Sequence, residues 1–252
     1  TGAYVGVALL RDLGIVAAIL GATASVALLG LVTERFLMRR FYAADSVMTA
    51  HLGQLLLTLG VSLVVTELVQ IAAGPNLLPT GDLPGFLNDR IGLVGGGYVD
   101  GYRAVIIVVG LVAFIAVAAI LRRTRTGLIV RAGVEDADMV QALRVNVRRS
   151  FTATFVIGSA MAGFAGLAAA FYYRGTFVTL GEEHLVLAFG IVVLGGLGSY
   201  LGSAVGALLV GLATVFISYW WPPGQTFIVM GLLAIVLIVR PQGLFGKEVA
   251  RA

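Results

Sequence analysis

The chain has 252 residues, of which 59% are hydrophobic and 12% are charged, with a formal net charge of +4 at pH 7. Soluble domains carry roughly a quarter charged residues, and half that fraction cannot cover a folded surface in water, so the composition predicts a membrane protein whose surface mostly faces lipid. The chain has no cysteine, which excludes disulfides, thiolate metal sites and a cysteine nucleophile.

The basic residues stand in short blocks between apolar runs. A nucleic-acid-binding protein gathers such residues on one face, whereas a multi-spanning membrane protein carries them in the loops between its helices. We therefore expect membrane lipid, and no nucleic acid, among the partners of this chain.

The first apolar stretch, residues 2–10, is too short to cross a bilayer, because a spanning helix needs about 20 residues. We interpret it as the tail of a helix whose beginning is missing, so the chain is expected to be truncated at its N-terminus. No signal peptide precedes it in this sequence.

Four longer apolar runs, residues 13–33, 46–66, 104–121 and 151–173, each predict one transmembrane helix. The segment from about 74 to 102 separates the second run from the third. Its prolines and glycines predict an irregular loop.

The last apolar region, residues 185–239, contains no Asp, Glu, Lys or Arg. As one helix rising about 1.5 Å per residue it is far too long for a single crossing. A glycine-rich run at 195–199 and the Trp-Pro-Pro-Gly run at 221–224 divide it. The resulting segments are roughly 185–197, 200–219 and 226–239.

Arginine and lysine gather in three blocks, and such blocks mark cytoplasmic loops. With all three inside, the loop from about 122 to 150 is cytoplasmic and the loop from about 74 to 102 is external. The last apolar region must then cross an odd number of times, which agrees with its division into three. The blocks are Arg35, Arg39 and Arg40; Arg122, Arg123, Arg125, Arg131, Arg144, Arg148 and Arg149; and Arg240, Lys247 and Arg251.

The predicted fold class is all-α: a polytopic bundle of about seven spanning or partly spanning helices, in a single transmembrane domain over residues 1–252. Small residues at every fourth position let helix backbones approach closely in lipid, and they predict where helices pack. These packing residues are Gly158, Ala162, Gly166 and Ala170 on one helix, and Gly198, Gly202 and Gly206 further on.

A polar stripe runs along the second apolar run, where Gln54, Thr58, Ser62 and Thr66 step by four residues. Residues at this spacing lie on one side of a helix. Polar groups in a bilayer face protein or a water-filled path, so the stripe predicts either hydrogen bonds between helices or the lining of a transport path.

The predicted cytoplasmic loop contains an acidic segment that turns apolar, at residues 135–143. Acidic residues favour the start of a helix, so we expect a short helix that offers apolar side chains to another protein. A simple solvated loop is the alternative. The candidate contact residues are Glu135, Asp136, Asp138, Met139, Ala142 and Leu143.

Groups that perform catalysis are scarce. No stretch matches the Gly-rich loop that cradles phosphates in ATPases, so the chain is not expected to hydrolyse ATP itself. His51 and His184 are far apart in the sequence. We therefore predict no catalytic residue, no metal ligand and no cofactor, and a membrane-embedded enzyme is disfavoured.

Several short motifs remain that none of these arguments uses. They are Glu34-Arg35, Thr58-Leu59-Gly60-Val61-Ser62, Gly127-Leu128-Ile129-Val130-Arg131-Ala132, Glu135-Asp136, Val145-Asn146, Phe155-Val156-Ile157-Gly158, Val193-Leu194-Gly195-Gly196-Leu197-Gly198-Ser199 and Arg240-Pro241-Gln242-Gly243-Leu244-Phe245-Gly246. Together they resemble the permeases of branched-chain amino acid importers over nearly the whole chain. The resemblance is closer to the first, H-type, of the two paired permease subunits than to the second.

The resemblance implies a permease subunit of an ATP-binding-cassette importer in the bacterial or archaeal inner membrane. An external binding protein would deliver a branched-chain or other small hydrophobic amino acid. Two permease subunits would form the pathway, and two ATPase subunits would dock on the cytoplasmic loops, with residues 135–143 in an ATPase groove. Similar permeases carry urea or short amides, so the substrate stays open.

The chain departs from the family pattern in two places. The family's opening helix is absent, which agrees with a truncated N-terminus. In Leu143-Arg144-Val145-Asn146 an arginine stands where the family has a glycine, which puts the local loop geometry in question. An ion-coupled secondary transporter or channel is the alternative function, although such proteins usually keep charged residues within their spans and these spans hold almost none.

Overall fold

The structure is a computed structural model of the chain. It describes all residues except 39–46, 75, 82–84, 93–97, 136–138, 140–146, 197, 223–229, 232–233, 237, 241–242 and 246–252. The chain divides into two compact units, Thr1–Val178 and Thr179–Ala252.

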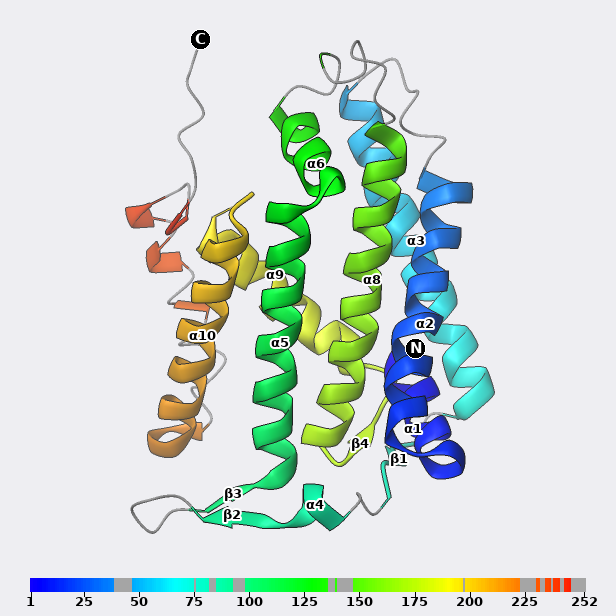
Figure 1. Cartoon of the computed structure of the whole chain (residues 1–252), viewed down its shortest axis with the longest axis vertical. Helices are drawn as coiled ribbons and strands as arrows, with labels where there is room; N and C mark the ends of the chain where they lie inside the picture. Colours follow the sequence, from blue (N-terminus) through cyan, green and yellow to red (C-terminus); the bar gives the residue numbers. More distant parts are fainter. Residues whose placement is uncertain are drawn as a thin grey trace. The chain divides into compact units, whose positions relative to one another are not determined.

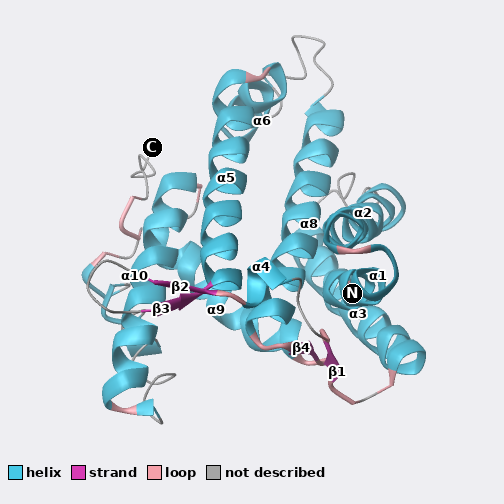
Figure 2. Ribbon diagram, turned by 60° about the horizontal axis from the view of Figure 1, so that its bottom comes forward, coloured by secondary structure: helices cyan, strands magenta, loops and turns pink. Residues whose placement is uncertain are grey.

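Helices make up nearly all of the described chain (Figures 1 and 2). A π-helical turn, η1 (Thr33–Leu37), continues the second helix directly. The helices of the first unit are α1 (Gly2–Leu13), α2 (Ile15–Val32), α3 (Val47–Ala73), α4 (Gly85–Asn88), α5 (Gly101–Arg123), α6 (Arg125–Glu135) and α8 (Val147–Tyr172). In the second unit the structure describes two complete helices, α9 (Leu180–Gly195) and α10 (Tyr200–Trp220).

Five helical segments in the described part of the chain are long and apolar enough to cross a membrane. They are Ile15–Leu37, Leu56–Ala73, Gly101–Arg123, Arg149–Tyr172 and Tyr200–Trp220. These segments overlap the four apolar runs and the middle of the last apolar region, so the predicted all-α polytopic fold is confirmed. The second one differs most from its prediction, because α3 continues past residue 66 to Ala73.

The other two segments expected in the last apolar region differ in how far they are described. α9 has 16 residues, which is about 24 Å of helix, shorter than the ~30 Å hydrocarbon core. Half of the residues in 226–239 lie outside the described part of the chain, and the described ones are helical.

The first apolar stretch forms helix α1, which packs against α2 and α8. Gly14, with φ of 86°, separates α1 from α2. Residues 2–10, interpreted from the sequence as the tail of a helix, thus belong to a helix that runs to Leu13 and contributes buried residues to the core.

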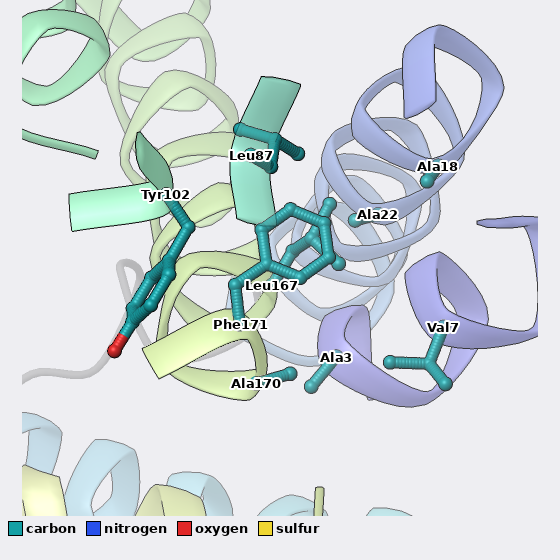
Figure 3. Close-up of a cluster of buried hydrophobic side chains, with 9 residues drawn as sticks. All are labelled: Ala3, Val7, Ala18, Ala22, Leu87, Tyr102, Leu167, Ala170 and Phe171. Carbon is teal, nitrogen blue, oxygen red and sulfur yellow. The ribbon is translucent and has the colours of Figure 1, made fainter. Parts of the chain in front are cut away.

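The core of the first unit forms where α1, α2 and α8 meet at small residues (Figure 3). Ala18, Ala22 and Ala170 have no exposed surface. A Cβ atom built on Gly163 would overlap the carbonyl oxygen of Ala22 and lie 2.9 Å from Cβ of Val26. Glycine at this position therefore sets how closely α8 approaches α2, as expected for helices packed in lipid.

The predicted stripe on α8 meets other helices of this chain only in part. Gly166 is in ordinary van der Waals contact with Ala3, and Ala170 is buried in the core. Gly158 faces open space, and Ala162 is exposed. The close approach instead involves Gly163, which the every-fourth-residue pattern passed over.

The predicted external loop is more ordered than expected. Strand β1 (Leu78–Pro79) pairs antiparallel with β4 (Gly175–Thr176), and β2 (Arg90–Gly92) pairs with β3 (Tyr98–Asp100). Leu87 of α4, 1% exposed, joins Tyr102 and Phe171 in the core (Figure 3). This loop and α6 lie at opposite ends of α5 (Figure 1).

In the second unit, α9 and α10 form a hairpin. The hydroxyl of Ser199 caps α10 by accepting a 3.0 Å hydrogen bond from the backbone N–H of Gly202. A Cβ on Gly202 would overlap the backbone of Gly195, and a Cβ on Gly206 would lie 3.0 Å from the carbonyl oxygen of Ile191. Two of the three glycines predicted to pack here thus lie against α9, while Gly198 stands in the turn with φ of 88°.

We expect Gly163→Ala to lower the free energy of unfolding by about 1–3 kcal/mol, because the added methyl forces α2 and α8 apart. The matched control is Gly158→Ala on the same helix, where a Cβ meets nothing within 4 Å and alanine favours the helix by roughly 1 kcal/mol. Thermal unfolding in detergent measures both. Equal melting temperatures for the two variants would contradict this account of the core.

Candidate functional site

The corner between α5 and α6 is built around Thr124. Its backbone N–H donates to the carbonyl oxygen of Ile120 at 3.2 Å, and its hydroxyl donates to the same oxygen at 2.6 Å. The hydroxyl also accepts from the backbone N–H of Gly127 at 3.1 Å. One side chain thus joins the last turn of α5 to the first turn of α6, in the manner of a helix N-cap.

Gly127 makes this corner tight. It is buried, and a Cβ at this position would overlap the backbone of Leu121. α6 packs against both α5 and α8. The corner is therefore a rigid joint rather than a hinge, because a side-chain hydrogen bond and direct backbone contact hold it together.

The outer side of this joint carries apolar side chains among arginines. Leu128 on α6 is 62% exposed. Further along the chain, beyond residues that the structure does not describe, Met139 is helical and 65% exposed. Arg125 and Arg131 are exposed on α6. Exposed apolar side chains rimmed by charge are typical of a surface that binds another protein.

The predicted contact segment is only partly described. Glu135 is the last residue of α6, which Thr124 caps at Arg125, and Met139 is helical. The short helix expected over residues 135–143 otherwise lies outside the described residues and stays a prediction. The side chain of Glu135 and all of Asp136, Asp138, Ala142 and Leu143 lie outside the described part of the structure, so their roles stay predictions.

Glu34 is a candidate that the patterns of periodicity and charge missed. It lies in η1, is 3% exposed, and η1 packs against α8. Ser150, near the start of α8, is buried as well. A buried carboxylate is costly and marks function more often than a lipid-facing residue does, and π-helical turns are frequent at functional sites. The signal in the sequence was a single carboxylate at the end of an apolar run.

The polar stripe lies on α3, which the rest of the described chain leaves largely uncovered. Gln54, Thr58 and Thr66 are half-buried, and Ser62 is exposed. None of the residues in the apolar window Leu56–Ala73 is buried. Lipid or another protein must therefore cover most of α3.

The other end of α5 carries arginines held by tyrosines. The guanidinium carbon of Arg103 lies 5.6 Å from the ring centre of Tyr172 and 5.8 Å from that of Tyr102. That of Arg174, whose φ is 54°, lies 5.7 Å from the Tyr102 ring. Tyrosine and arginine in this arrangement are typical of a membrane–water interface.

Within the described residues, no group of three His, Asp or Glu side chains is placed to hold a metal ion.

Comparison with known proteins gives one consistent relationship. A family model described as the branched-chain amino acid transport system permease component matches residues 1–239. The high-affinity branched-chain amino acid transport system permease protein LivH of Escherichia coli is 36% identical over 58% of this chain and 47% of its own length. The corresponding protein BraD of Pseudomonas aeruginosa is 33% identical over 60% of this chain and 50% of its own.

A probable branched-chain amino acid transport permease protein LivH of Methanocaldococcus jannaschii is 24% identical over 98% of this chain and 80% of its own length. The alignments to the Escherichia and Pseudomonas proteins span about half the length of those relatives. No solved structure matches the chain.

The orientation of the α5–α6 joint can be tested with single cysteines, because the chain has none of its own. We expect Leu128→Cys to react with a membrane-impermeant maleimide only in inside-out vesicles. Tyr98→Cys, at a position 73% exposed in the predicted external loop, should react in intact cells. The reverse pattern would invert the orientation on which the site depends.

Proposed function

Because the chain belongs to the branched-chain amino acid transport permease family, we propose that it is the membrane-spanning subunit of an ATP-driven importer in a bacterial or archaeal plasma membrane. Its cargo is a branched-chain or other small hydrophobic amino acid, and separate ATPase subunits hydrolyse ATP. The observation that carries the proposal is the family match over residues 1–239.

The rigid α5–α6 joint supports a role in coupling. A force on the exposed side of α6 passes into α5 through Thr124 and into the close contact between Gly127 and Leu121. It also reaches α8, against which α6 packs. A flexible loop would absorb such a force, whereas this joint passes it to two membrane-spanning helices.

The segment that follows α6 is the proposed contact with the ATPase subunit. Methionine is enriched in the buried centres of protein interfaces, and Met139 is 65% exposed in this chain alone. The neighbouring acids and arginines would then set the orientation of docking. The proposed contacts are Glu135, Asp136, Asp138, Met139, Ala142 and Leu143.

A second permease subunit, identical or paralogous, is the proposed neighbour of α3. Leu56, Leu63 and Ile71 are 71%, 65% and 80% exposed, and the polar stripe gives the same helix a side that lipid solvates poorly. Placing the stripe at the junction of two subunits would let Gln54, Thr58, Ser62 and Thr66 line the transport path. An external binding protein would deliver the amino acid to this path.

We expect Met139→Arg combined with Leu143→Arg to reduce ATP-coupled uptake at least about tenfold, the loss that corresponds to ~1.4 kcal/mol of docking free energy. Uptake by the complete importer in proteoliposomes measures this effect. Copurification with the ATPase subunit should fall in parallel, because two charges would replace apolar contacts.

The matched control is Leu77→Arg combined with Tyr98→Arg, at positions that are 56% and 73% exposed in the predicted external loop. This variant adds the same charge and should keep the ATPase subunit bound. Normal uptake by a well-expressed Met139/Leu143 variant would refute the coupling role. Gradient-driven uptake by the chain alone would favour an ion-coupled transporter instead.

The lining role predicts different reactivity on two sides of α3. We expect Ser62→Cys to react with a charged thiosulfonate reagent and substrate to slow that reaction, because the stripe faces a water-filled path. Val64→Cys, two residues on and therefore on the opposite side of the helix, should stay unmodified in lipid. Equal reactivity of the two cysteines would rule out the lining.

A further inference from the structure

Two motifs that lie far apart in the sequence meet in the second unit. The backbone N–H of Leu244 donates to the carbonyl oxygen of Leu194 at 2.8 Å, and that of Phe245 donates to the carbonyl oxygen of Gly195 at 3.1 Å. The turn Gly243–Phe245 therefore lies against the last residues of α9. We call this turn the C-terminal clamp.

The clamp donates hydrogen bonds to carbonyl oxygens that have no partner within their own helix. The last carbonyl oxygens of an α-helix have no partner within that helix, and Leu194 and Gly195 are the last two residues of α9. Both are buried. The two donors of the clamp thus complete the end of α9, at the side of the membrane that the basic Arg240 marks as cytoplasmic.

Gly243 allows the clamp to lie close to the end of α9. Its φ is 80°, a conformation that side chains disfavour. A Cβ on Gly243 would lie 2.5 Å from both the Cα and the nitrogen of Gly196. Glycine is therefore required at this position for two reasons: the backbone has a positive φ, and a Cβ would overlap the backbone of Gly196.

The clamp also joins the apolar core of this unit. Leu194 and Val210, each 1% exposed, form that core, and Leu244 packs against it together with Val236. Gly195, the next residue after Leu194, lies against the backbone of α10. Opening the clamp would uncover apolar surface and strip α9 of both terminal hydrogen bonds in one step.

We infer that the clamp is a permanent connection, which makes it move with α9 and α10 as one rigid body during transport. Gly243 and Leu244 are then positioning residues of the transport subunit. Only the transport readout of this inference rests on the proposed function.

The first test closes the clamp covalently. Leu194→Cys combined with Leu244→Cys, in a chain without other cysteines, should form a disulfide on mild oxidation. A protease site inserted after Gly224 makes the disulfide visible, because the two fragments stay joined on a non-reducing gel. Leu244→Cys alone provides the unlinked control.

The uptake rate of the disulfide-linked protein shows whether the clamp stays closed or has to open during transport. We expect the complete importer to keep its uptake rate within about twofold on oxidation, relative to the same protein after reduction. An uptake that stops on oxidation and returns on reduction would overturn the inference, since the clamp would then have to open. Failure of the disulfide to form would overturn it as well.

The second test compares two glycines that share a positive φ. Gly243→Ala adds both strain and overlap, whereas Gly198→Ala, at φ of 88° with nothing within 4 Å of a new Cβ, adds strain alone. We expect Gly243→Ala in the cysteine pair to lose the disulfide and most uptake while keeping the ATPase subunit bound. Gly198→Ala should retain the disulfide.

Equal disulfide formation in these two variants would contradict a role for the close contact between Gly243 and Gly196. The disulfide readout needs no substrate. If the chain imported none of the expected amino acids, the proposed function would fail. The cross-linking result would still show whether residues 194 and 244 lie together as the clamp requires.

Discussion

Close approach of helix backbones is the interaction on which this fold depends. Lipid tails solvate apolar side chains as well as a neighbouring helix does, so van der Waals contact between backbones has to hold the helices together. Gly163 brings α8 to α2, and Gly127 brings α6 to the end of α5. In the second unit, Gly195 and Gly202 bring α9 to α10. At each position a Cβ would force the backbones to shift.

The same contacts define which parts can act as rigid bodies. The α5–α6 joint is tied by Thr124 and by backbone contact at Gly127, so the exposed side of α6 around Leu128 is connected directly to a membrane-spanning helix. The clamp ties the end of the second unit in a similar way. In the described part of α3, a Cβ on Gly60 would meet nothing within 4 Å and no residue of Leu56–Ala73 is buried, which is why the proposed transport path is placed where this helix meets a second subunit.

Some features of the site followed from local patterns, and others did not. The exposure of Met139 could be expected because this residue follows a run of acids in a loop rich in arginine. The helix α6 was missed because its arginines were interpreted as a loop, although Thr124 offers a helix cap. Glu34 was missed as a buried group because burial depends on η1 packing against α8, and no periodicity in the sequence reports such packing.

The sequence by itself determined that the chain is a multi-spanning helical membrane protein, because apolar length and scarce charge follow directly from the cost of burying polar groups in lipid. Only the tertiary structure decided which small residues pack. Gly158 and Gly163 stand on the same helix, yet only Gly163 meets another backbone. Likewise, the bond between Leu244 and Leu194 joins residues that no local pattern relates. Such contacts depend on where a neighbouring backbone lies, which side-chain order along one helix does not specify.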